Sequence, residues 1–177
     1  KKIKMYQNNK INIVGGGLAG CEAAYQISKL GIEVNLYEMR PNIKTEAHKT
    51  ELLGELVCSN SFRSDDKDYN AVGVLHEELR IADSLIMKAA DLHKVPAGSA
   101  LAVDRDNFAN HIDKSIKENK NINVIHQEIT SLNQFKKEIV VVATGPLTSK
   151  KLTKNIKEKK SETSLAFYDA IAPIVYK

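Results

Sequence analysis

Three glycines near the start of the chain are spaced for binding a phosphate group. The segment 15–20 reads Gly-Gly-Gly-Leu-Ala-Gly, a match to the pattern Gly-x-Gly-x-x-Gly. The first glycine permits a tight turn, the second lets a pyrophosphate approach the backbone, and the third allows the following helix to pack closely. The amino terminus of that helix offers free N–H groups to the phosphates. The predicted contacts in this turn are Gly15, Gly16, Gly17, Leu18, Ala19 and Gly20.

An acidic residue follows this turn at the distance that dinucleotide binding requires. Glu38 stands 18 residues after Gly20, at the end of the next apolar run. Its carboxylate can accept a hydrogen bond from a ribose hydroxyl, and its charge disfavours a 2′-phosphate, which argues against NADP. The glycine pattern alone arises by chance. The full order of strand, turn, helix, strand and acid therefore predicts a dinucleotide site, without separating FAD from NAD.

Two later segments favour FAD. The apolar run from residue 140 ends in Ala143-Thr144-Gly145, and Val103-Asp104-Arg105 is followed by Phe108. Both resemble elements that pass near FAD in the glutathione-reductase-like superfamily, although the first is, in itself, only a turn after a buried strand. We add five predicted cofactor contacts outside the glycine turn: Arg40, Arg105, Ala143, Thr144 and Gly145.

A cysteine in a polar segment could act as a nucleophile. Cys58 is followed by Ser, Asn and Arg side chains up to residue 64, and Arg63 could lower the pKa of the thiol. Composition favours the alternative of a buried, inert cysteine, which the neighbouring Leu56 and Val57 support. His48 could be a base, a flavin neighbour or only a loop residue. Cys21, in the first helix turn, is expected to pack there.

The elements that must position these residues follow from the hydrophobic pattern. Ile11–Val14 and Glu33–Tyr37 read as strands, and Leu18–Leu30 reads as a helix that Gly31 ends. Together they predict a parallel β-α-β unit of about 28 residues. The polar stretch 40–69 has no clear periodicity and is too long for an ordinary loop, so we expect it to be functional or disordered.

The remaining elements are predicted from the same signals. Ala71–Leu92 reads as one long helix with Leu75, Leu79, Ala82, Ile86 and Ala89 on one face, before a break at 96–98. Asp106 is expected to cap a helix that runs to about Lys117. Three further strands are predicted at Leu101–Val103, Ile122–His126 and Ile139–Ala143, the last of them buried on both faces because it is almost purely β-branched.

Composition bounds the class of protein. With 177 residues and 42% hydrophobic content, the chain is long enough for one packed domain. No apolar run approaches the roughly 18 residues of a membrane span, and the glycines at 15–20 cut the first run too short for a signal peptide. Two cysteines form no disulfide framework, which favours a reducing cytoplasm. The pattern predicts no metal site.

The net charge is compatible with nucleic acid without being diagnostic of it. The sequence has 26 Lys and Arg against 22 Asp and Glu, a formal net charge of +4. Six lysines and one glutamate fall in 150–160, which we interpret as a solvated loop or helix face.

A set of specific motifs resembles one enzyme family. They recur there in the same order and span nearly the whole chain after residue 10. The motifs are Leu36–Pro41, Ala47–Thr50, Leu56–Ser64, Asn70–Leu75, Val95–Gly98, Ala100–Arg105, Ala143–Ser149, Phe167–Ala170 and Ala172–Val175. The family is the methylenetetrahydrofolate-dependent, FAD-containing tRNA (uracil-5-)-methyltransferases. Gly16 and Ser99 stand where the family often has Ala and Gly.

The resemblance implies an activity and its partners. Methylenetetrahydrofolate would supply the carbon, reduced flavin the electrons, and NADH or NADPH would reduce the flavin. The product would be 5-methyluridine in RNA, usually in the T-loop of tRNA, with ribosomal RNA as an alternative. Cys58 matches a motif cysteine proposed as the nucleophile towards uracil, and this resemblance makes the nucleophile role the favoured one.

The expected domain organisation is that of an incomplete enzyme. Residues 1–10 are expected to form a flexible basic terminus, 11–149 an α/β, Rossmann-like FAD-binding domain of the glutathione-reductase-like superfamily, and 150–177 the start of a following segment. Family members are considerably longer, with a second motif cysteine beyond residue 177. We therefore expect an amino-terminal fragment. Two alternatives stay open: another FAD oxidoreductase that touches no RNA, or a catalytically incomplete cofactor-binding remnant.

Overall fold

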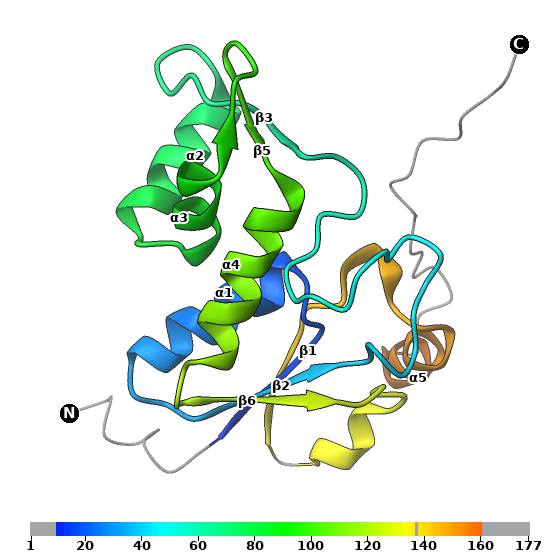
Figure 1. Cartoon of the computed structure of the whole chain (residues 1–177). Helices are drawn as coiled ribbons and strands as arrows, with labels where there is room; N and C mark the ends of the chain where they lie inside the picture. The colour runs from blue at the N-terminus through cyan, green and yellow to red at the C-terminus, as the bar shows by residue number, and fades with distance from the viewer. Residues whose placement is uncertain (1–9, 137, 161–177) are drawn as a thin grey trace, which may run out of the picture.

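A parallel sheet forms the centre of the molecule. The computed structural model describes residues 10–136 and 138–160. Within them, β1 (Ile11–Val14), β2 (Val34–Glu38), β6 (Ile122–His126) and β7 (Ile139–Val142) pair in the order β6-β2-β1-β7. All neighbours run parallel, with Ile11 opposite Val34 on one side and Ile139 on the other (Figure 1). The predicted strands and the predicted α/β, Rossmann-like class are confirmed.

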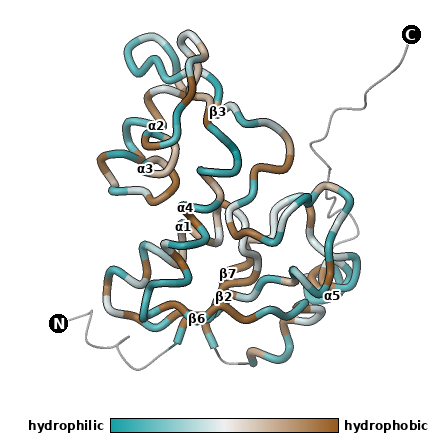
Figure 2. Tube along the Cα trace, in the orientation of Figure 1, coloured by the Kyte–Doolittle hydropathy of each residue, from teal (hydrophilic) through white to brown (hydrophobic). Residues whose placement is uncertain are grey.

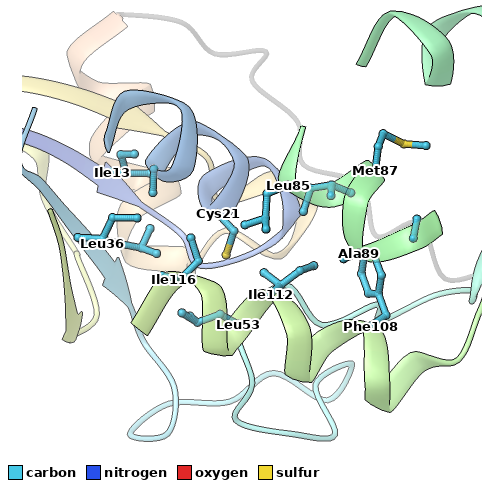
Figure 3. Close-up of a cluster of buried hydrophobic side chains, with 14 of the residues drawn as sticks. Ile13, Cys21, Leu36, Leu53, Leu85, Met87, Ala89, Phe108, Ile112 and Ile116 are labelled. Carbon is cyan, nitrogen blue, oxygen red and sulfur yellow. The ribbon is translucent and has the colours of Figure 1, made fainter. Parts of the chain in front are cut away.

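Helices α1 (Leu18–Lys29) and α4 (Arg105–Lys117) pack together against one face of this sheet (Figure 1). α1 ends where predicted, since Leu30 is its C-cap and Gly31 follows with a φ of 75°. The main hydrophobic core lies between these layers (Figure 3). Its fully buried members include Ile13, Cys21, Leu36, Leu53, Phe108, Ile112 and Ile116.

A second, smaller core covers the other face of the sheet. The 3-10 helix η2 (Leu132–Phe135) and α5 (Lys150–Lys160) pack there, with η3 (Gly145–Leu147) leading from β7 towards α5. Buried Val14, Phe135 and Leu152 meet in this core. The lysine-rich segment is thus a helix, hydrophilic along most of its length (Figure 2), that is anchored through Leu152.

A small antiparallel sheet and two helices stand apart from the central sheet. β3 (Ser61–Ser64), β5 (Ala100–Val103) and β4 (Lys94–Val95) pair in the order β3-β5-β4. α2 (Ala71–Ile81) and α3 (Leu85–Leu92) lie beside them (Figure 1). β3 gives regular structure to part of the stretch 40–69, and the pattern did not predict β3 or β4.

The prediction of one long helix over Ala71–Leu92 was wrong. The helix stops at Ile81, Asp83 takes a φ of 62°, and α3 starts after Ser84. The Ser84 hydroxyl accepts a hydrogen bond from Met87 N–H at 3.1 Å, as an N-cap does. Glu22 of α1 accepts hydrogen bonds from the N–H groups of Leu85 and Ile86, so a tertiary contact also favours a new helix start.

Two smaller predictions also need correction. β7 is an edge strand among the described residues, with Ile139 and Val142 more than two-fifths exposed, and is not buried on both faces. α4 is capped by Asp104, whose carboxylate accepts from Asn107 N–H at 2.9 Å, and Asp106 lies inside its first turn. Residues 1–9 of the predicted terminus 1–10 and the motifs Phe167–Ala170 and Ala172–Val175 lie outside the described residues.

Candidate functional site

A cavity of about 450 Å³ lies where β1, β2 and β7 end. This edge of a parallel sheet is where α/β folds bind nucleotides, and the volume is in the range of small-molecule pockets. Most of the predicted site residues line it. Those that do are Gly15, Gly16, Gly17, Leu18, Ala19, Glu38, Arg40, Cys58, Ala143, Thr144 and Gly145. Gly20 and Arg105 do not line it.

The glycine turn has the geometry of a phosphate cradle. Gly15 takes a φ of 108° as the chain leaves β1, and α1 begins directly after Gly17. A Cβ built on Gly17 would meet no neighbouring atom within 4 Å, so the space beside its backbone is open. A Cβ on Gly20 would lie 1.8 Å from the Gly15 carbonyl oxygen, which explains why Gly20 contributes through packing. The cradle therefore fits a pyrophosphate at the helix amino terminus.

Glu38 is held by the turn that it follows in sequence. One carboxylate oxygen accepts a hydrogen bond from Gly16 N–H at 2.9 Å. The other accepts from the Arg40 backbone N–H at 3.0 Å and from Arg40 Nε at 2.9 Å. Since a carboxylate offers about four lone-pair sites, it keeps acceptor capacity for a ligand hydroxyl.

Arg40 is buried between two carboxylates. Only 1% of its side chain is exposed, and it forms ion pairs with Glu38 at 2.9 Å and with Glu55 at 2.8 Å. Burial alone would raise the pKa of Glu38, but the hydrogen bonds and charge of Arg40 and the Gly16 N–H outweigh it and lower the pKa. Glu38 is therefore ionised at neutral pH. We call these three residues the Glu38–Arg40–Glu55 cluster.

The two cysteines occupy opposite environments. Cys58 is exposed and lines the cavity, which removes the buried, inert interpretation for this residue. Cys21 is fully buried in the main core, as expected, and burial together with the Glu38 charge raises its pKa to about 12 (Figure 3). Cys58 is thus the thiol that a bound molecule can reach.

Arg105, and not Arg63, contacts the Cys58 backbone. Arg63 lies on β3 and does not line the cavity, so its predicted role beside Cys58 gains no support from the structure. Arg105, at the start of α4, donates from Nη2 to the Cys58 carbonyl oxygen at 3.2 Å. Its side chain therefore restrains the segment that carries the thiol.

Two cavity residues were not assigned a role from the sequence. Glu55 gave no signal of its own except its place three residues before Cys58. His48 lines the cavity, its Nδ1 lies 2.9 Å from Thr45 Oγ1, and burial and the Arg40 charge lower its pKa. The imidazole is therefore neutral near pH 7 and can accept or pass on a proton.

Within residues 10–136 and 138–160, no three His, Cys, Asp or Glu side chains gather in a way that could hold a metal ion. No helix there has the length and apolarity needed to cross a membrane.

Comparisons with known proteins give a consistent result. The family model described as glucose inhibited division protein A matches residues 10–177. Proteins named methylenetetrahydrofolate–tRNA-(uracil-5-)-methyltransferase TrmFO from Bartonella henselae and Rhizobium etli are each 57% identical, over 166 and 167 residues. Each alignment covers 94% of this chain and 35% of the relative, so the chain spans about a third of their length. The crystal structure of Thermovibrio ammonificans THI4 aligns with a TM-score of 0.49 and 17% identity, covering 91% of this chain and 65% of that one.

Proposed function

This chain belongs to the glucose inhibited division protein A family, and from that membership we propose that it forms the FAD-binding part of a folate-dependent RNA (uracil-5-)-methyltransferase. The names of the 57%-identical relatives supply the reaction and the substrates, methylenetetrahydrofolate and tRNA. The proposal extends to the whole protein, with NADH or NADPH as the source of electrons, and to action in the cytoplasm. Ribosomal RNA is the alternative substrate.

The residues of the cavity fit FAD. The glycine turn and the start of α1 would bind the pyrophosphate, and Glu38 would bind a ribose hydroxyl with its remaining lone pairs. Ala143, Thr144 and Gly145, which follow β7 beside the glycine turn, would pass beside the cofactor. When bound and reduced, the flavin supplies the electrons that complete the methyl group.

One observation carries the proposed reaction: Cys58 presents an exposed thiol on the wall of the cavity that the glycine turn also lines. A thiolate can add to C6 of uracil, and the electron pair then makes C5 a carbon nucleophile. C5 would bond to the methylene carbon of methylenetetrahydrofolate as one C–N bond of the donor breaks. Loss of the C5 proton and cleavage of the remaining C–N bond, which releases tetrahydrofolate, would leave a methylene group on C5. A hydride equivalent from the reductant would turn that group into methyl, and departure of the Cys58 sulfur from C6 would restore the C5–C6 double bond. His48, neutral near pH 7, faces the same cavity as a candidate proton acceptor.

The test is Cys58→Ala in the full-length protein. We expect it to abolish 5-methyluridine formation on a tRNA transcript, measured by nucleoside mass spectrometry with methylenetetrahydrofolate and a reductant present. FAD binding, read from the flavin absorbance spectrum, should be retained because the phosphate cradle is untouched. Methylation at the normal rate would refute the nucleophile role of Cys58.

The same assay on the unaltered protein separates the alternatives. Bound FAD without 5-methyluridine on either tRNA or ribosomal RNA would favour an FAD oxidoreductase that acts on another substrate. A folded but colourless protein that cannot be loaded with FAD would favour a remnant that has lost its cofactor.

A further inference from the structure

We propose that Glu55, acting through Arg40, is a positioning residue that holds the Cys58 segment against the dinucleotide site. This inference rests on the function proposed above. It assigns a role to the charged side chains of Glu55 and Arg40, which would act on the reaction only through the position of the thiol. It predicts that the placement of the thiol depends on the Glu38–Arg40–Glu55 cluster.

Glu55 closes the loop that precedes Cys58. One carboxylate oxygen accepts the N–H groups of Lys49 at 2.8 Å and Thr50 at 3.1 Å. The other forms the 2.8 Å ion pair with Arg40 Nη1. With only 9% of its side chain exposed, Glu55 is shielded from the water that weakens surface ion pairs. A single carboxylate thus closes the loop 49–55 and attaches it to Arg40, just beyond the end of β2.

Two sets of hydrogen bonds connect Glu55 to the phosphate cradle. Arg40, which pairs with Glu55, also pairs with Glu38, and Glu38 accepts a hydrogen bond from the Gly16 N–H. Gly54, directly before Glu55, donates its own N–H to the Gly16 carbonyl oxygen at 2.9 Å. The N–H and the carbonyl oxygen of Gly16 are therefore both hydrogen-bonded. The first bonds to Glu38, which pairs with Arg40, and the second bonds to Gly54, the residue before Glu55. A shift of Glu55 must move the loop relative to the cradle or break these bonds.

Cys58 is close enough to Glu55 for this restraint to reach the thiol. Only Leu56 and Val57 separate them, and both line the same cavity. Downstream, Arg105 holds the Cys58 carbonyl at 3.2 Å. The thiol therefore lies between two restraints that belong to different parts of the fold. Misplacing a reacting group by about 1 Å can cost roughly a hundredfold in rate, so such restraints matter for a nucleophile.

The experiment compares Glu55→Gln with Glu51→Gln in the full-length, FAD-loaded protein. Glu51 lies in the same loop, is exposed, and among the described residues forms its one ion pair with Lys44, at 3.1 Å, so its variant is a matched control. For Glu55→Gln we expect kcat per bound flavin to fall by roughly tenfold to a hundredfold. The KM for RNA and the Kd for FAD should change by less than about threefold, because neither contact is removed.

A second readout does not depend on methylation. The rate of iodoacetamide alkylation of Cys58, followed by peptide mass spectrometry, should differ several-fold between Glu55→Gln and Glu51→Gln, because the released segment no longer holds the exposed thiol in one position beside the bound cofactor. Glu55→Asp, which keeps the charge, should recover part of the loss in kcat. If Glu55→Gln does not fold, Arg40→Lys takes its place, since a point charge cannot contact both carboxylates as a guanidinium does.

The outcomes separate this inference from the proposed function. An unaltered protein that makes no 5-methyluridine would overturn the function, while the alkylation rates would still report on the positioning role. Normal kcat and a control-like alkylation rate in Glu55→Gln, or in Arg40→Lys where that variant is used, would overturn the positioning role. A fall in melting temperature with unchanged kcat per bound flavin would show that Glu55 only stabilises the fold.

Discussion

At the scale of single residues, burial separates two side chains of the same type. Cys58 is exposed on the cavity wall, whereas Cys21 is fully buried and has a pKa raised to about 12. The thiolate is the reactive form of cysteine, so the two should differ in chemistry at any physiological pH. The sequence predicted that Cys21 packs in the helix, whereas for Cys58 the residues alone left a buried, inert cysteine as an alternative because Leu56 and Val57 precede it.

Alkylation should therefore distinguish the two cysteines. In the folded full-length protein at pH 8, we expect iodoacetamide to modify Cys58 and to leave Cys21 unmodified, because almost no Cys21 thiolate exists at that pH. Peptide mass spectrometry with and without urea measures this, and denaturant should make both react. Modification of Cys21 in the native protein at the rate of Cys58 would contradict the burial described here.

Substitution of Gly17 should affect FAD binding, whereas substitution of Gly20 should affect the stability of the fold. Gly17→Leu should abolish FAD binding, because the side chain would occupy the open space beside the cradle, while unfolding of the cofactor-free protein changes by less than about 0.5 kcal/mol. Gly20→Ala should destabilise the fold by about 1–3 kcal/mol, since its Cβ would collide with the Gly15 carbonyl oxygen. Flavin absorbance and urea unfolding measure the two effects. A Gly17→Leu protein that binds FAD normally would argue against the cradle.

Among the secondary-structure elements, the sequence predicted those in which apolar residues recur with a regular period. The strands β1, β2 and β6 and helix α1 have regular apolar spacing and clear ends, and they lie close to their predicted positions. The break at Asp83 was missed because the apolar spacing continues across it. The new start at Ser84 depends partly on Glu22, 62 residues earlier, and no local pattern contains that contact.

In the site, too, the sequence predicted only the residues whose spacing along the chain forms a local pattern. The glycine turn and Glu38 were predictable because their spacing along the chain reflects a local β-α-β unit. Glu55 was not, since no local pattern shows that its carboxylate forms a 2.8 Å ion pair with the buried Arg40. The exposure of β7 was also unpredictable, because β-branched composition does not say how many neighbours a strand has.

The cap of α3 provides a test at this scale. The Ser84 side chain is buried, accepts from Met87 N–H, and donates to Glu22 at 2.8 Å. We expect Ser84→Ala to lower the free energy of unfolding by about 1–3 kcal/mol, because it removes a cap and leaves Glu22 short of one donor. Urea unfolding measures the change. Ser131→Ala, which removes a less buried cap of η2, should cost less, and equal costs would argue against the contribution of Glu22.

At the scale of the whole molecule, two charge clusters join separate elements. The Glu38–Arg40–Glu55 cluster ties β2 and the loop before Cys58 to the glycine turn. In the second, Asp65 receives hydrogen bonds from Arg80 at 2.9 Å and lies 2.9 Å from His76 Nδ1, which joins the end of β3 to α2. Partial burial would raise the pKa of Asp65, but Arg80 and His76 outweigh it and lower the pKa.

These lowered pKa values give stability a defined pH dependence. A carboxyl group with a lower pKa in the folded state contributes stability that is complete above its unfolded pKa, near 4, and that is lost as the pH falls through the folded pKa. The contribution of Glu38 and Asp65 to the free energy of unfolding of the cofactor-free protein should therefore be steady above about pH 5 and fall below pH 4. Glu38→Gln should be less stable than the unaltered protein at pH 7, and the gap should narrow in acid, where Glu38 is itself protonated. Urea titrations at several pH values measure both curves. A gap of constant size down to acid pH would mean that the ionised form of Glu38 contributes nothing, and that the cluster is held by packing alone.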